Sequence, residues 1–216
     1  MSETSQLGER TAADVIGLYG NVGDVLTYQE FLDTAPAMIA RANFAGVQLA
    51  QAATNTLLIS AGQLMVTGAG LAVLDHALDQ GRLLRAVSTC LEEVETAESR
   101  LQRLAASEPV ETTQRAFGGL LDTTEAFEGW TRALEPDACQ LCQWWAREGR
   151  VWPTGHSMPT HKGCQCTQRP VLTEKVVAPV SRSAQRASEK REAFGSLDDR
   201  RLVDPSAYMK PRRRTL

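Results

Sequence analysis

Residues 139–166 read CQLCQWWAREGRVWPTGHSMPTHKGCQC, and this stretch holds four of the chain's five cysteines and two of its three histidines. Cys139 and Cys142 form one pair, and a second short segment carries His161, Cys164 and Cys166. Thiolates and imidazoles are donors that zinc prefers in proteins. Packing alone gives no reason to gather such side chains in one region, so the clustering indicates a metal site.

The spacing of these residues suggests how one ion can be held. Structural zinc sites bind four donors in a tetrahedron, usually as chelating pairs from two short segments. His161 and Cys164 can chelate from a turn at the intervening glycine, whereas Cys164 and Cys166, two residues apart, tend to face opposite ways on an extended backbone. The predicted ligands are Cys139, Cys142, His161 and one or both of Cys164 and Cys166.

Other interpretations of the thiols remain open at this point: unrelated cysteines, two disulfides, or a redox pair. A closed, thiolate-rich site is normally structural, and the chain contains no His-Glu-x-x-His motif. We therefore expect structural zinc and no enzymatic activity. Three tryptophans of the region are expected to pack over the site: Trp144, Trp145 and Trp152. His156 is a poorer ligand candidate, which can instead contact the ligands from outside.

The same stretch resembles the C-terminal domain of Mu F-type phage head morphogenesis proteins. That domain reads Cys-x-x-Cys, then a glycine, then Pro-x-His-Pro-x-Cys-Arg-Cys and a hydrophobic strand. The matching positions are Cys139, Cys142, Gly149, Pro159, His161, Cys164 and Cys166. The chain departs from the pattern at Lys162, where the family favours Pro, and at Gln165, where it favours Arg. The match covers about residues 134–172.

The resemblance implies a minor capsid protein of a tailed phage, a structural component of the virion that is made in the host cytoplasm. Its expected partners are the portal protein at the portal vertex and other proteins of the inner head. The family's enzymatic fusions are not carried over, because the chain has no segment long enough for one.

Composition predicts a mainly α fold. Aromatic residues make up only 6% of the chain and alanine is frequent, which suits helices better than a β-sandwich. We expect a helical body over residues 1–133, a small α+β zinc-stapled domain over 134–172, and a basic tail over 173–216 that is extended or disordered.

Within the body, residues 1–10 are expected to fray and Thr11 to begin a short helix that ends near Tyr19. Thr34 begins a long helix with Pro36 in its first turn, and a hinge at residues 68–70 precedes a further helix. A helix over 82–106 is predicted to end at Pro109, and another covers 111–134. The apolar stripe of the 82–106 helix comprises Leu84, Val87, Leu91, Val94, Leu101 and Leu104. Cys90 is expected to be a buried inert thiol, and His76 structural or exposed.

Between Arg41 and Asp75 the chain contains no charged residue. This length could span a bilayer, but amides and hydroxyls interrupt it repeatedly, and each is costly in hydrocarbon. A buried or subunit-facing helix is favoured over a membrane-active segment. Small residues such as Gly46 would let another helix approach closely, and self-association through the helical body is left open.

Charge is unevenly distributed along the chain. Residues 173–216 hold 11 Lys and Arg against 6 Asp and Glu, whereas residues 1–172 hold 12 against 20. The tail, with Arg212, Arg213 and Arg214, can contact packaged DNA non-specifically, or it can simply be solubilising. Two other functions stay under consideration: a zinc-ribbon nucleic-acid-binding regulator and, less favoured, a membrane-penetrating ejection protein.

Overall fold

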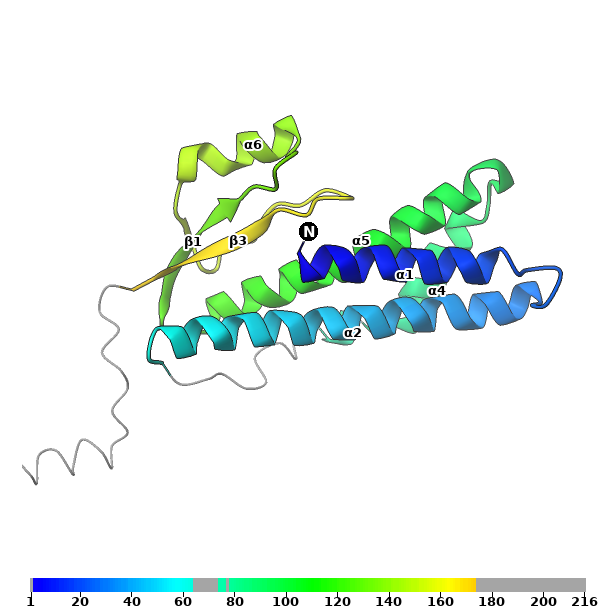
Figure 1. The fold of residues 1–216 in the computed structure, drawn as a ribbon, viewed down its shortest axis with the longest axis horizontal. Helices are drawn as coiled ribbons and strands as arrows, with labels where there is room; N and C mark the ends of the chain where they lie inside the picture. The colour runs from blue at the N-terminus through cyan, green and yellow to red at the C-terminus, as the bar shows by residue number, and fades with distance from the viewer. Residues whose placement is uncertain (1, 64–73, 77, 174–216) are drawn as a thin grey trace, which may run out of the picture. The chain divides into compact units, whose positions relative to one another are not determined.

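The structure, a computed structural model, describes residues 2–63, 74–76 and 78–173 (Figure 1). Its helices are α1 (Glu3–Tyr19), α2 (Tyr28–Ser60), α4 (Gln80–Cys90), α5 (Val94–Asp122), α6 (Gln140–Ala146) and a 3-10 turn η1 (Arg147–Gly149). Its strands are β1 (Phe127–Ala133), β2 (Trp152–Pro153) and β3 (Thr167–Leu172). A mainly α fold with a small strand-containing C-terminal region is thus confirmed. The predicted hinge at 68–70 and the tail from residue 174, including Arg212–Arg214, lie outside the described residues.

Both N-terminal helices begin earlier than predicted. Ser2 caps α1 by accepting a hydrogen bond from the Ser5 amide, so residues 3–10 are helical rather than frayed. Thr27 and Glu30 form a reciprocal capping box that begins α2, and Pro36 lies inside that helix. The predicted start at Thr34 is therefore wrong, because a complete cap occurs at Thr27, about two helical turns upstream.

The predicted helix over 82–106 is two helices, and the sequence stripe crosses the break between them. α4 ends at Cys90 and α5 begins at Val94, a residue that is 82% exposed. α5 then continues through Pro109, which was wrongly predicted to end a helix. Proline removes one helical hydrogen bond, but here α5 packs along both α1 and α2, and that burial offsets the loss.

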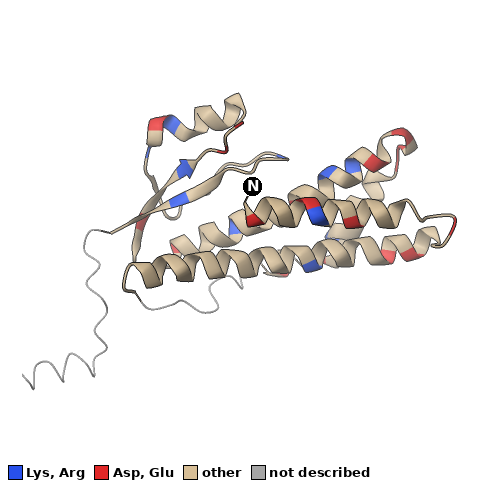
Figure 2. Cartoon of the chain, in the orientation of Figure 1, with Lys and Arg blue, Asp and Glu red and all other residues tan. Residues whose placement is uncertain are grey.

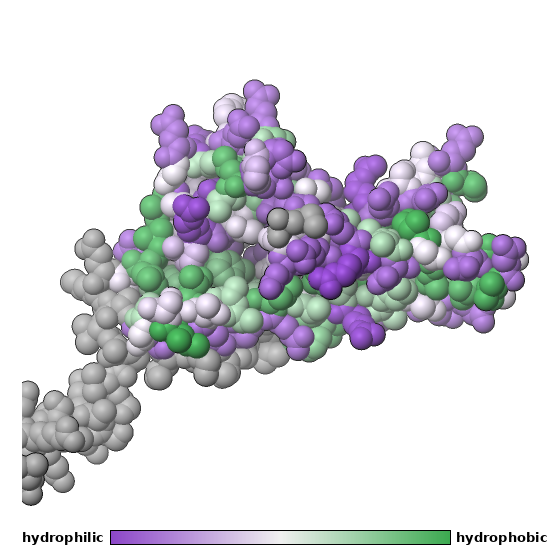
Figure 3. Space-filling model, in the orientation of Figure 1, coloured by the Kyte–Doolittle hydropathy of each residue, from purple (hydrophilic) through white to green (hydrophobic). Residues whose placement is uncertain are grey.

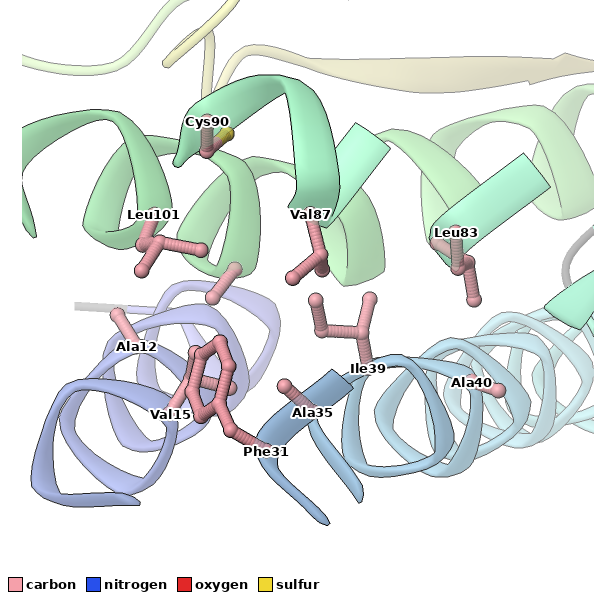
Figure 4. Close-up of a cluster of buried hydrophobic side chains, with 11 residues drawn as sticks. Ala12, Val15, Phe31, Ala35, Ile39, Ala40, Leu83, Val87, Cys90 and Leu101 are labelled. Atoms are coloured by element: carbon pink, nitrogen blue, oxygen red, sulfur yellow. The ribbon is translucent and has the colours of Figure 1, made fainter. Parts of the chain in front are cut away.

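The main core lies where α1, α2, α4 and α5 meet (Figure 4). Phe31 and Ile39 of α2 face Val87 of α4 and Leu101 of α5, and all four side chains are fully buried. Cys90 is buried beside them, as predicted. Farther along, α2 and α5 come so close that a Cβ on Gly46 would lie 2.9 Å from the Pro109 carbonyl oxygen. The expectation that a small residue permits close helix approach is thus confirmed at Gly46.

The uncharged sequence falls largely in α2, whose later part carries no coloured charged segment in Figure 2. Its buried positions include Asn43, Val47, Ala50 and Leu58, and Figure 3 shows a surface over the end of α2 that mixes apolar and polar residues. Over the described ranges, no helix combines the length and apolar character that membrane crossing requires.

A three-stranded antiparallel sheet follows α5, in the order β2-β1-β3. Trp130 of β1 lies opposite Trp152 of β2, and Arg132 lies opposite Gln168 of β3. The helix predicted over 111–134 is therefore wrong beyond Asp122. β1 contains the aromatic residues Phe127 and Trp130, and its buried and less buried positions partly alternate, as is typical of a strand. The backbone of Trp152 leaves no room for a Cβ at Gly129. β1 lies before the predicted domain boundary at residue 134, although its partners lie after it.

Candidate metal centre

The first pair of thiols is placed by the short helix α6. Cys139 is the N-cap of α6, with an extended backbone conformation, and Cys142 lies in the first turn. Three residues apart on one helical turn, the two side chains point to the same side. Cys139 is exposed and Cys142 is fully buried, so the pair reaches from the surface to the interior of the small domain.

The second segment forms a tight turn around Gly163. Gly163 has a φ of +82°, a conformation that glycine adopts without strain, and the Cys164 amide donates to the His161 carbonyl oxygen at 3.0 Å. The predicted turn is therefore present, but the two donor atoms fall in different donor groups, His161 with Cys139 and Cys142, and Cys164 with Cys142 and Cys166. Lys162, where the resembled family favours Pro, does not prevent this turn.

The two segments bring their donors together. His161 Nε2 lies 3.2 Å from the sulfurs of both Cys139 and Cys142, and the Cys142 and Cys164 sulfurs are 3.5 Å apart. Donor atoms around a tetrahedral zinc ion are about 3.5–3.8 Å apart. These three separations are close to that spacing, and each of the two donor groups described next could hold a metal ion.

Five donors form two overlapping groups that share Cys142. One group contains Cys139, Cys142 and His161, and the other contains Cys142, Cys164 and Cys166; within each group every donor atom lies within 4.8 Å of the others. Cys164 and Cys166 are both buried and belong to the same group, so their two-residue separation does not send them to opposite faces. All five cysteines are free thiols in this structure.

Arg132 is a constituent of the site that the sequence did not indicate. Its guanidinium Nη2 lies 3.5 Å from the sulfurs of both Cys142 and Cys164, and both terminal nitrogens donate to the Pro159 carbonyl oxygen at 2.9 Å. The guanidinium carbon lies 5.1 Å from the ring centre of Trp145. The sequence predicted a helix over this segment, and a helix would not place Arg132 near the ligands. Predicting a strand that pairs with residues 167–172 would have placed it beside them.

Local electrostatics distinguish the two thiols of the first pair. Hydrogen bonds from the backbone amide of Cys142, and further ones from its thiol, the Leu141 amide and His161, lower the pKa of Cys139. Burial raises the pKa of Cys142 to about 12. Burial also acts to lower the pKa of Arg132, but its hydrogen bond to Cys142 and the charges of the neighbouring thiolates raise it overall. Metal binding therefore has to displace a proton from Cys142.

Contacts from the helices hold the second segment in place. The Gln114 side-chain amide of α5 donates to the Cys164 carbonyl oxygen at 3.0 Å and to the Cys166 carbonyl oxygen at 2.8 Å. Lys162 Nζ lies 2.9 Å from a Glu111 carboxylate oxygen, and the Ser5 hydroxyl of α1 donates to Gln165. The two departures from the family pattern, Lys162 and Gln165, are thus residues that contact the helical body.

The aromatic residues pack only partly as predicted. Trp145 packs against the buried cysteines, and its ring centre lies 6.2 Å from that of His161. Trp144 is 77% exposed, so the expectation that it covers the site is wrong. Trp152 does not cover the site either, because it packs against the separate cluster that contains Trp130. It stacks on His156 with ring centres 4.4 Å apart, and the Arg150 guanidinium lies 4.3 Å from its ring centre. Both His156 and His76 are outside the donor groups, and His76 is exposed as expected.

The cluster of sulfur and imidazole donors on two turns, held against α5 and enclosing one guanidinium, is the feature that carries most information about function. No family model, curated protein or solved structure matches the chain.

Proposed function

We propose that this protein is a structural minor capsid protein of a tailed phage, with a zinc-stapled domain of the Mu F type. The observation that carries the proposal is the pattern Cys139-x-x-Cys142 followed by His161-x-x-Cys164-x-Cys166, which resembles that family in sequence. The convergence of the same residues into donor groups in the fold supports it.

Zinc is the proposed ion because the donors are thiolates and an imidazole. The proposed ligands are Cys139, Cys142, His161 and Cys164, which are linked by three donor–donor contacts of 3.2–3.5 Å. Cys142 joins the two donor groups, and metal binding would draw Cys164 toward His161, because no donor group contains both. Cys166 is the spare donor, beside Cys142 and Cys164. Four protein ligands leave no open coordination position, which is typical of a structural rather than a catalytic zinc site.

The proposed role of the ion is to fix the small domain against the helices. Residues that flank or separate the ligands contact α5 and α1, so ordering the turn also orders the contacts of Gln114, Lys162 and Gln165. A small domain with few buried apolar residues commonly requires such a staple. The result is a rigid surface suited to the portal vertex and the inner head.

Contacts of the local cations favour this role over a zinc-ribbon regulator. Arg132 is buried, Lys162 pairs with Glu111, and Arg150 lies over Trp152. Arg147 and Arg169 are exposed, but they are few beside the phosphates that a DNA-binding surface neutralises, and phosphate contacts dominate non-specific DNA affinity. Contact with packaged DNA is therefore proposed only for the basic tail, through residues that include Arg212, Arg213 and Arg214.

Particle analysis and co-purification test the proposal. We expect mass spectrometry of purified virions to find the chain, and the portal protein of the same phage to co-purify with it. The Cys139→Ser/Cys142→Ser variant, which lacks one chelating pair, should lose portal binding while its helical circular dichroism persists. Absence of the chain from mature particles, together with no portal binding by the wild type, would rule the proposal out.

A further inference from the structure

A single charged side chain, Arg132, lies among the buried sulfurs. Arg132 is only 6% exposed, although arginine is rarely buried without a partner. Its Nη2 atom is 3.5 Å from the sulfurs of Cys142 and Cys164, two of the proposed ligands. A neutral pair of thiols is a weak partner for a buried guanidinium, whereas thiolates are strong ones.

The position of the guanidinium is fixed by groups that are not ligands. The Pro159 carbonyl oxygen accepts from both terminal nitrogens at 2.9 Å, and the Trp145 ring covers the guanidinium at 5.1 Å. Arg132 also lies on β1, within a paired stretch of the sheet, opposite Gln168. The charge is thus held beside the sulfurs by backbone geometry and stacking, before any ion binds.

Charge counting indicates what this cation does. Three thiolates, one neutral imidazole and one divalent ion carry a net charge of −1, because the thiolates outweigh the ion. The guanidinium of Arg132 brings the buried assembly to neutrality, and burying an uncompensated charge is expensive. A fourth thiolate from Cys166 would leave an excess negative charge that Arg132 alone does not balance.

We propose that Arg132 is a positioning residue of the metal centre, one that neutralises a three-thiolate, one-histidine complex and thereby raises its affinity for a divalent ion. This inference rests on the proposed zinc centre and deepens it. It also assigns Cys166 to a place beside the complex rather than within it. Residues that orient or neutralise ligands in this way commonly change metal affinity by about 10–100-fold when replaced.

Metal affinity and metal-free stability together distinguish charge neutralisation by Arg132 from a purely structural role. If Arg132 only packs β1 against α6, its replacement lowers the stability of the metal-free protein and leaves the affinity of the folded site unchanged. If it neutralises the complex, affinity falls more than metal-free stability does. Arg169 of β3 offers a matched control, because it lies opposite Thr131 and is exposed.

The experiment is a competition titration of the full, reduced chain with zinc and a chromophoric chelator, repeated with cobalt(II) to record the visible spectrum. We expect Arg132→Gln to weaken zinc binding by about 10–100-fold and Arg132→Lys to weaken it less, because the charge is retained. Arg169→Gln should bind as the wild type does. Cys166→Ser should keep the tetrahedral cobalt spectrum with three sulfur ligands, and Cys164→Ser should change it.

The outcomes separate this inference from the proposed function. If the wild type binds neither zinc nor cobalt, the metal centre itself is wrong. If the wild type binds and Arg132→Gln binds equally well, only the role of Arg132 is overturned; a changed cobalt spectrum in Cys166→Ser overturns the assignment of Cys166. Should Arg132→Gln fail to fold, Arg132→Lys decides: retention of most of the affinity supports neutralisation, and a loss as severe as that of Cys142→Ser contradicts it.

Discussion

Gln114 offers a sharp test of how α5 holds the ligand-bearing turn. The side chain is buried, and its amide nitrogen donates to the carbonyl oxygens of both Cys164 and Cys166. Gln114→Leu removes both hydrogen bonds and leaves two buried carbonyl groups without this donor. Each such group costs about 1–3 kcal/mol when it stays dry.

One opposing contribution reduces this loss. The Gln114 amide oxygen is buried without a hydrogen-bond partner, so leucine also removes an unfavourable group. Subtracting about 1–3 kcal/mol for that oxygen leaves a net destabilisation of about 2 kcal/mol. For a chain of this size, we expect Tm to fall by about 4–8 °C. Zinc affinity should fall as well, because the ion then has to order a turn that α5 no longer holds.

Urea and thermal unfolding of the reduced protein, with and without zinc, measure both effects. Gln143→Leu is the matched control: its side-chain amide also donates to a backbone carbonyl oxygen, that of Ala138, but it is exposed and its contact is local. Comparable destabilisation by the two variants, or unchanged zinc affinity in Gln114→Leu, would refute the argument that α5 preorganises the turn.

Gly46→Ala should lower the free energy of unfolding by about 1–3 kcal/mol in urea titrations, because its Cβ would meet the Pro109 carbonyl oxygen at 2.9 Å; Gly17→Ala, which meets nothing within 4 Å, should not destabilise. Burial acts to raise the pKa of Glu108, but Arg82, Lys162 and Arg115 lower it overall. The ionised Glu108 therefore adds to the free energy of unfolding above its unfolded-state pKa, and this stabilisation is lost as pH falls through its lower folded-state pKa. Below pH 4.5, the free energy of unfolding should therefore fall less steeply with decreasing pH in Glu108→Gln than in the wild type. An unchanged slope would contradict this role of Glu108. Zinc at a thousandfold excess over its Kd should stabilise the chain by about 4 kcal/mol, which a chelator should abolish; equal Tm values with and without chelator would exclude a stabilising ion.

Several features of the fold and site were accessible from local sequence patterns. The Cys-x-x-Cys spacing on α6 and the glycine turn between His161 and Cys164 are short-range features, and both occur as predicted. The close approach of α2 at Gly46 and the burial of Cys90 also follow from residue size and local pattern.

Features that depend on contacts between residues far apart in the chain could not be predicted from the sequence. Pro109 does not end α5, because packing against α1 and α2 overrides its local effect. β1 was predicted as helix, since its sheet partners lie more than twenty residues later in the chain, and Arg132 was missed for the same reason. Gln114 contacts carbonyl oxygens about fifty residues away, and backbone acceptors leave no mark in a sequence.

The metal content of freshly purified, reduced protein, measured by elemental mass spectrometry, decides whether a structural ion holds the small domain together. We expect one equivalent of zinc per chain, and loss of that zinc from the Cys139→Ser/Cys142→Ser variant. Wild-type protein that folds with its helices intact and carries no bound metal would contradict it.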